Sequence, residues 1–208
     1  MPLSDRDYMR NPPPRWRPGG YRGRRSWNFG LSPVWVLIII NFLFLVATTI
    51  SRDVLLNLGL IPAAFSQRPW TLITAMFVHA GFGHIFGNML TLFFFGRFLS
   101  RLVGDKKFLL VYFVGGIVGN LLYLLLGNPL SIAVGASGAV YAIAGTLVVL
   151  TPNVRVLLWF FIPMPLWVVV VVFFLLWSFI PGVAWQAHLG GLLVGAVAGY
   201  FFRRRGGY

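Results

Sequence analysis

Residues 34–50, VWVLIIINFLFLVATTI, form a run of seventeen residues without a single charge. Such a run is apolar enough, and nearly long enough, to cross the hydrocarbon core of a bilayer as one helix. The rest of the chain is similar, because 58% of its 208 residues are hydrophobic and only 10% are charged. Ordinary soluble domains carry about 25% charged residues. The sequence therefore predicts an all-α, multi-pass membrane protein.

Five more apolar segments follow the first. Several are shorter than the roughly 20 residues that a lone transmembrane helix needs, and the fourth and the last are rich in small residues. Both properties favour helices that are buried among other helices, so the sequence predicts a bundle of six transmembrane helices. The further segments are expected at about 84–99, 108–126, 137–151, 165–179 and 186–202.

The basic residues predict the orientation of this bundle. With six spans, both ends of the chain lie on one side, and fifteen of the seventeen lysines and arginines lie on that side. Only Arg52 and Arg68 fall on the other. The positive-inside rule then places both termini in the cytoplasm. Residues 1–30 are interpreted as a disordered basic tail that contacts anionic lipid headgroups, and residues 31–205 as the membrane domain.

The connection between the first two spans, residues 51–83, is unusually apolar and is interrupted by Gly59, Pro62 and Pro69. We interpret it as short helices in the outer membrane interface, with Trp70 as an aromatic anchor.

Composition excludes several kinds of chemistry. The chain has no cysteine and no glutamate, which rules out thiolate nucleophiles and metalloprotease motifs of the HExxH type. Asp53 and Asp105 are placed at opposite edges of the bundle, so a pair of intramembrane catalytic aspartates is rejected. No cofactor and no nucleic-acid partner is expected, and a small-solute transporter is disfavoured because no internal repeat is evident.

A serine between glycines opens the fourth span, in the sequence Gly135-Ala136-Ser137-Gly138. Gly135 and Gly138 permit close backbone approach, and a helix start leaves N–H groups free to stabilise negative charge. An acyl-transfer nucleophile needs both features beside it. The other interpretation is ordinary helix packing, in which the Ser137 hydroxyl bonds a carbonyl.

His188 lies near the outer end of the last span, on one helix face with Gly191, Gly195 and Gly199. If this face packs on the small-residue face of the fourth span, His188 comes to Ser137 and can accept its proton. No carboxylate lies in either span to orient the ring, so the sequence predicts a catalytic dyad with Tyr141 packed against the histidine. A hydrogen-bonded structural histidine is the alternative.

His84 and Asn88 are four residues apart and share a face of the second span. Both can donate hydrogen bonds, so near Ser137 they predict an oxyanion site. His79 precedes them. A three-histidine metal site is the competing hypothesis, and it lacks carboxylates to orient its ligands; no metal is expected.

Together, the Gly135-Ala136-Ser137-Gly138 motif, His188 with its glycines, and His84-Ile85-Phe86-Gly87-Asn88 resemble the rhomboid family of intramembrane serine proteases. The resemblance extends over about residues 34–205. It implies the six-helix rhomboid bundle, with Ser137 as nucleophile and His188 as general base. It further implies that His84, Asn88 and the Ser137 N–H line the oxyanion hole, that Tyr141 stacks on His188, and that His79 supports the loop region.

One residue departs from the family pattern, since Thr71 follows Trp70 where the family usually has arginine. The resemblance implies an endopeptidase that cleaves transmembrane segments of other membrane proteins. The expected location is a prokaryotic cell membrane. A non-catalytic, chaperone-like rhomboid relative remains the alternative. The sequence does not indicate the substrate or the oligomeric state.

Overall fold

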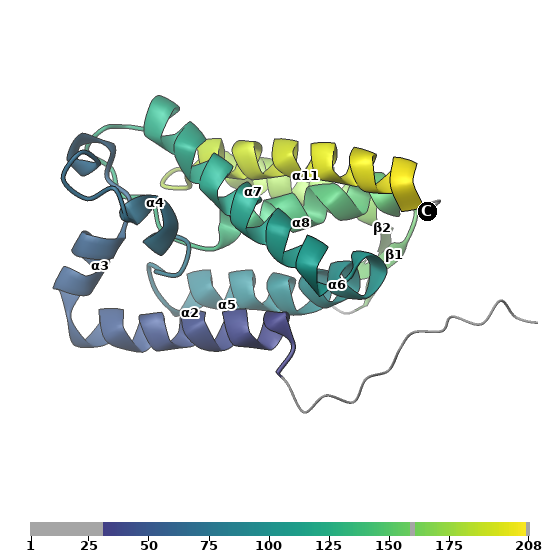
Figure 1. Ribbon diagram of the computed structural model, residues 1–208, viewed down its shortest axis with the longest axis horizontal. Helices are drawn as coiled ribbons and strands as arrows, with labels where there is room; N and C mark the ends of the chain where they lie inside the picture. Colours follow the sequence, from purple (N-terminus) through teal and green to yellow (C-terminus); the bar gives the residue numbers. More distant parts are fainter. Residues whose placement is uncertain (1–30, 159–160, 207–208) are drawn as a thin grey trace, which may run out of the picture. The chain divides into compact units, whose positions relative to one another are not determined.

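The computed structural model of the protein describes residues 31–158 and 161–206, and these residues are mostly helical (Figure 1). The tail predicted for residues 1–30 lies outside the described residues. Helices occur in all six apolar segments. They are α2 (Pro33–Ile50), α5 (Phe82–Thr91) continued by the π-helix η3 (Leu92–Gly96) and by α6 (Arg97–Val103), α7 (Asp105–Leu126), α8 (Ser137–Leu150), α9 (Leu166–Val168) continued by the π-helix η4 (Val169–Phe174) and by α10 (Leu175–Ser178), and α11 (Trp185–Gly206).

Two of the described helices, α2 and α7, are each long and apolar enough to cross a membrane. The second and fifth segments are each divided by a π-helical turn, and α8 has only 14 residues. The six-span arrangement therefore stays a prediction.

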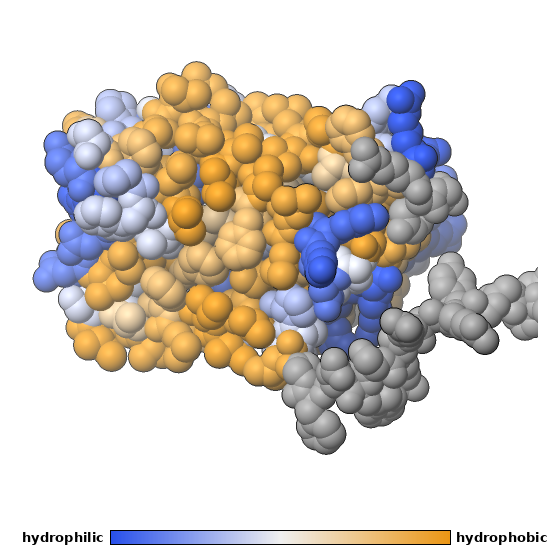
Figure 2. All heavy atoms as spheres, in the orientation of Figure 1, coloured by the Kyte–Doolittle hydropathy of each residue, from blue (hydrophilic) through white to orange (hydrophobic). Residues whose placement is uncertain are grey.

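The surface agrees with a membrane environment. Figure 2 shows, on the face in view, hydrophobic residues across the middle and hydrophilic residues gathered toward both ends. Phe86, Leu125, Leu193 and Val197 are large apolar side chains that are at least half exposed. Helices with apolar outer faces are stable in lipid, where exposed apolar surface carries no hydrophobic penalty.

Glycines bring α7, α8 and α11 into backbone contact. A Cβ atom added to Gly195 of α11 would lie 2.2 Å from the Ala142 carbonyl oxygen of α8, and one added to Gly119 of α7 would lie 2.6 Å from the Ala187 carbonyl oxygen of α11. Only glycine fits such positions. The small residues of the fourth and last segments thus form the helix contact that their spacing predicts.

Short helices fill the connection between α2 and α5: α3 (Arg52–Leu58), the 3₁₀ turn η2 (Pro62–Ala64) and α4 (Thr71–Thr74). Hydrogen bonds tie this connection to itself and to the bundle. The Trp70 indole N–H donates to the Asn57 carbonyl at 3.1 Å, and the Asn120 amide of α7 donates to the Leu72 carbonyl at 2.8 Å.

Thr71 and Arg68 form further hydrogen bonds within this connection. Thr71 is buried, and its hydroxyl donates to the Arg68 carbonyl at 2.6 Å. The Arg68 guanidinium in turn donates to the Leu56 carbonyl at 2.6 Å. A guanidinium therefore anchors this connection, three residues before the position at which the family pattern has arginine.

The prediction of an all-α fold omitted one element. Strands β1 (Arg155–Leu158) and β2 (Ile162–Pro165) form an antiparallel hairpin, with Arg155 opposite Pro165. The hairpin lies between the spans predicted at 137–151 and 165–179, and strand pairing between two such short runs leaves little periodic signal in sequence.

Candidate active site

Ser137 is the first residue of α8, and the chain enters this helix through Gly135. Gly135 has φ of +118°, a backbone conformation that other residues rarely adopt. The first N–H groups of any helix lack partners within it, so those of Ser137 and Gly138 lie at a site that favours negative charge. Ser137 is only partly buried. The hydroxyl therefore combines partial exposure with neighbouring backbone donors.

His188 lies in the first turn of α11, beside Ser137. Its Nε2 atom is 2.8 Å from the Ser137 hydroxyl oxygen, although 51 residues separate the two in sequence. His188 is 6% exposed, so the ring is shielded while the serine remains reachable. This pair has the geometry of a nucleophile and its general base.

Backbone contact between α8 and α11 sets this distance. A Cβ atom added to Gly191, one turn after His188, would lie 1.9 Å from the Gly138 carbonyl oxygen, and one added to Gly138 would lie 3.2 Å from the Ala187 carbonyl oxygen. The two helices therefore approach as closely as backbones allow, right beside the pair.

Two further side chains fix the imidazole. The Tyr141 ring stacks on it, with centroids 4.2 Å apart and planes at 12°. On the other ring nitrogen, Nδ1 of His188 lies 2.7 Å from the hydroxyl oxygen of Ser178 in α10. The Tyr141 hydroxyl is 2.8 Å from that same oxygen. The predicted stacking is present, whereas Ser178 was not identified from sequence because an isolated serine in an apolar segment carries no motif.

His84 of α5 lies against the backbone that leads to Ser137. A Cβ atom added to Gly135 would be 2.7 Å from the His84 Nε2 atom. The Ala80 N–H points to the His84 Nδ1 atom at 3.4 Å. If Nδ1 accepts this bond, Nε2 carries the proton and is a donor that lies beside Gly135.

Asn88 is on the same helix face, and it is 7% exposed. Its amide nitrogen donates to the His84 carbonyl at 2.9 Å, one turn back in α5. An amide NH₂ has two hydrogens, so one donor of Asn88 remains for another partner.

His79 supports the residue before the serine. Its Nε2 atom accepts the Ala136 N–H at 3.4 Å, and its Nδ1 atom lies 3.3 Å from the Phe77 carbonyl oxygen. Burial, together with the nearby His84, lowers the pKa of His79 to about 3. The ring is therefore neutral at physiological pH, with Nδ1–H as donor and Nε2 as acceptor.

In the described part of the chain, no three His, Cys, Asp or Glu side chains are grouped as metal ligands. The rings of His79 and His84 are in edge contact, with centroids 5.1 Å apart. The hydrogen bonds above account for a nitrogen of each ring without an ion.

The chain is similar to known proteins over most of its length. Residues 66–205 match the Rhomboid domain. The chain is 31% identical to Rhomboid-like protease 3 of Toxoplasma gondii over 142 residues. This match covers 61% of this chain and 54% of that protein. It is 31% identical over 207 residues to the mitochondrial RHOMBOID-like protein 12 of Arabidopsis thaliana, covering 85% of this chain and 61% of that protein. It is 43% identical over 77 residues to the putative rhomboid protease YdcA of Bacillus subtilis, and this match covers 36% of this chain and 38% of that protein.

The Rhomboid domain matches well over half of the length of this chain. The match defines the class of the protein, which is an integral membrane protein from a family of intramembrane proteases. This chain belongs to the rhomboid family. It spans between about half and three fifths of the length of the first two relatives. Relatives named as proteases and relatives named only as rhomboid-like both occur among them.

Proposed function

We propose that the protein is an intramembrane serine endopeptidase that cleaves transmembrane segments of other membrane proteins near the outer face. The observation that carries this proposal is the 2.8 Å contact between the Ser137 hydroxyl and His188 Nε2, at a helix start with free backbone donors. No cofactor enters the reaction.

The reaction proceeds in two halves. The Ser137 oxygen attacks the carbonyl carbon of the scissile peptide bond while His188 Nε2 takes the hydroxyl proton. His188 then gives this proton to the leaving amine, and an acyl-enzyme remains on Ser137. A water molecule, deprotonated by His188, hydrolyses the ester and restores the free serine.

The tetrahedral intermediate carries a negative oxygen that needs donors. The Ser137 N–H, His84 Nε2–H and the second N–H of Asn88 are assigned to it, supported by the position of His84 beside Gly135. Gly135 and Gly138 allow the backbone to approach. Tyr141 holds the imidazole by stacking, and His79 holds the Ala136 N–H.

A non-catalytic rhomboid-like protein that binds unstable membrane helices is the alternative. Several relatives are named only as rhomboid-like. Their names do not decide between the two functions, whereas the hydrogen-bonded serine and histidine favour the protease.

The experiment that separates them is labelling of purified protein with a fluorophosphonate, which reacts with activated serines. We expect the wild-type chain to be labelled and Ser137→Ala to remain unlabelled. A folded wild-type protein that is not labelled, and that binds but does not cut membrane substrates, would establish the chaperone-like alternative.

The assignment of Asn88 is tested separately. Loss of one oxyanion donor typically slows acyl transfer by about 10²–10³. We expect Asn88→Ala to lose turnover up to that factor with nearly unchanged substrate binding, because the bond forms mainly in the transition state. Labelling by a small electrophilic probe should continue, since Ser137 and His188 are intact. Asn88→Ala that fails to bind substrate contradicts the assignment.

The proposed fold has six membrane spans with both termini in the cytoplasm. Fifteen of seventeen basic residues then lie inside. We expect reporters at both termini to be cytoplasmic and a reporter after Ser51 to be outside. An external reporter at Tyr208 would contradict this topology. The membrane itself is not decided by the relatives, which include mitochondrial and bacterial proteins, so the prokaryotic cell membrane stays a prediction.

A further inference from the structure

A hydrogen-bonded chain extends from His188 to the helical segment that precedes it. Ser178, the last residue of α10, is 2% exposed, and its hydroxyl oxygen is 2.7 Å from His188 Nδ1. The other ring nitrogen faces Ser137 at 2.8 Å. The imidazole is thus held between two serine hydroxyls.

We propose that Ser178 is a positioning residue that keeps His188 in its productive tautomer, as the third member of a Ser137–His188–Ser178 relay. A neutral imidazole has one N–H and one bare nitrogen. With Nδ1–H donating to Ser178, Nε2 is bare and can accept the Ser137 proton. When Nε2 becomes protonated, both ring N–H groups still have acceptors. This inference rests on the proposed function.

Ser178, and no described carboxylate, accepts the hydrogen bond from His188 Nδ1. The described acidic residues Asp53 and Asp105 lie in the first turns of α3 and α7, and neither bonds the ring. The titratable groups that face the ring are Tyr141 of α8 and His84 of α5. On the α7 side, Gly119 contacts the backbone of the preceding residue, Ala187. Tyr141 strengthens the arrangement, since its hydroxyl bonds Ser178 while its ring stacks on the histidine.

The kinetic test uses the full chain and a transmembrane substrate. We expect Ser178→Ala to lower kcat by roughly 10- to 100-fold, the range for losing a hydrogen bond to a group that becomes charged, with KM nearly unchanged. The acid limb of its pH–rate profile should move to lower pH, because a protonated ring no longer has an acceptor at Nδ1. Ser178→Thr keeps the hydroxyl and should restore most of the rate.

A matched control removes a different buried hydroxyl, which lies in the contact between α8 and α11. Thr146 of α8 bonds the carbonyl oxygens of Ala142 and Gly195 at 2.8 and 3.1 Å. Thr146→Val should lower the melting temperature without moving the acid limb. If Ser178→Ala and Thr146→Val change the profile equally, or neither changes it, the relay is wrong.

A second readout does not depend on activity. Nitrogen NMR of ¹⁵N-histidine-labelled protein in the Ser137→Ala background reports which His188 nitrogen is protonated. We expect the Nδ1–H tautomer, and a mixture after Ser178→Ala is added. A His188 with the Nε2–H tautomer overturns the relay, whereas an inactive wild-type chain with the Nδ1–H tautomer overturns only the proposed protease function.

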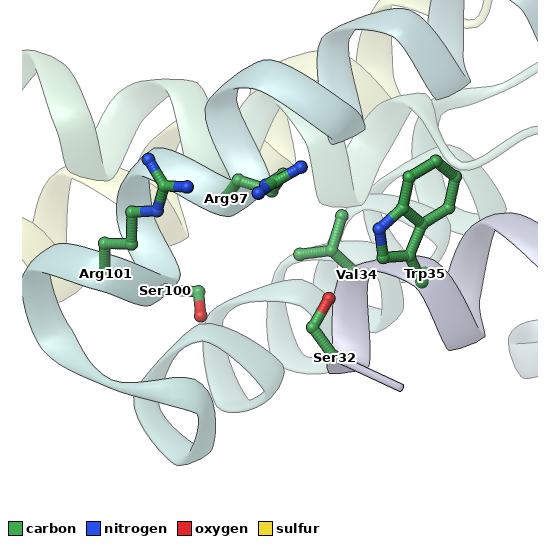
Figure 3. Close-up of a pocket in the computed structure, with 6 residues that line it drawn as sticks. All are labelled: Ser32, Val34, Trp35, Arg97, Ser100 and Arg101. Carbon is green, nitrogen blue, oxygen red and sulfur yellow. The ribbon is translucent and has the colours of Figure 1, made fainter. Parts of the chain in front are cut away.

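A separate observation concerns the opposite end of the bundle. Arg97 and Arg101 lie one turn apart on α6 and border a hollow of about 250 Å³. Figure 3 shows the side chains that line it from α6 and from the start of α2, with the Trp35 indole among them. A second hollow, of about 320 Å³, is bordered by the same two arginines and by Phe93, Phe94 and Phe98.

The arginines of this site form no ion pair within the part of the chain that the structure describes. Among residues 31–158 and 161–206, no ion pair involves Arg97 or Arg101, and the Arg97 guanidinium rests 5.0 Å from the centre of the Phe93 ring. The nearby Ser100 hydroxyl is already bonded to the Asp105 carboxylate. Two guanidinium groups are therefore available for a phosphate, which they bind in bidentate geometry.

We infer that this site binds the headgroup of an anionic phospholipid. A free phosphate would need only the two arginines. The second hollow adds aromatic side chains beside them, and one of these, Phe94, is 48% exposed on the apolar surface. Trp35, 42% exposed, is of the type enriched at membrane interfaces. The arginines match the anionic headgroup of a lipid, and the aromatic side chains match its acyl chains.

The test compares variants that remove equal charge. We expect phosphatidylglycerol, added to protein in zwitterionic detergent, to raise the melting temperature of the wild-type chain and of Lys106→Gln/Lys107→Gln. Arg97→Gln/Arg101→Gln should lose this shift and should retain fewer phosphatidylglycerol molecules in native mass spectrometry. Equal loss in both double variants, or an equal effect of phosphatidylcholine, overturns the site. An equal effect of inorganic phosphate overturns the lipid and leaves a phosphate site.

Discussion

Replacing either Ser137 or His188 with alanine is expected to abolish cleavage of a transmembrane substrate while the protein still inserts and folds. The two side chains share one hydrogen bond of 2.8 Å and act on the same proton, so neither can catalyse acyl transfer without the other. Loss of either member of such a pair lowers kcat by roughly 10⁴–10⁶. Because they act as a unit, the double variant should be no slower than either single one.

The measurement is single-turnover cleavage of a model substrate by the three variants, alongside their melting temperatures. His188→Ala should also lose labelling by a fluorophosphonate, since its serine has no base. Substantial turnover by Ser137→Ala at an unchanged cleavage site would contradict the mechanism. Labelling of His188→Ala at the wild-type rate would contradict the role of the histidine.

The second large effect is expected from Gly191→Ala, which adds one methyl group without touching the pair. Its Cβ would lie 1.9 Å from the Gly138 carbonyl oxygen, and backbone cannot rotate away as a side chain does. The helices α8 and α11 must separate by about 1 Å or more to restore van der Waals contact. Misplacement by this distance can cost about 10²-fold in rate, and overpacking destabilises by about 1–3 kcal/mol.

Gly87→Ala is the matched control, because Gly87 is also helical and has no atom within 4 Å of an added Cβ. We expect it to keep the melting temperature and most of the activity. Rates and melting temperatures of the two variants are measured in the same detergent. If Gly191→Ala cleaves as fast as the wild type, close contact between α8 and α11 does not set the distance between Ser137 and His188.

Much of the candidate site could be anticipated because its parts leave local signals. Gly191 and Gly195 follow His188 at helical spacing, and this predicted the face that packs on α8. Ser137 between glycines predicted an accessible hydroxyl at a helix start, which the structure has. Tyr141, one turn further, was expected against the imidazole and stacks on it at 4.2 Å.

Other features depended on contacts between distant segments. Ser178 is one serine in an apolar segment, and nothing in its neighbours marks it. Its proximity to His188 Nδ1 exists only because the end of α10 meets the first turn of α11. The anchoring of Thr71 was likewise unpredictable, since its partner Arg68 reaches back twelve residues to the Leu56 carbonyl.

Helical periodicity and small-residue spacing are properties of neighbouring positions in the chain, so they determined the helices and the faces that meet. The orientation of a side chain after packing depends on which carbonyl or hydroxyl a distant segment presents. The amide of Asn120 donates to the Leu72 carbonyl, and the hydroxyl of Ser178 lies at His188. A buried polar group must find a partner wherever the fold offers one, and only the folded chain specifies that partner.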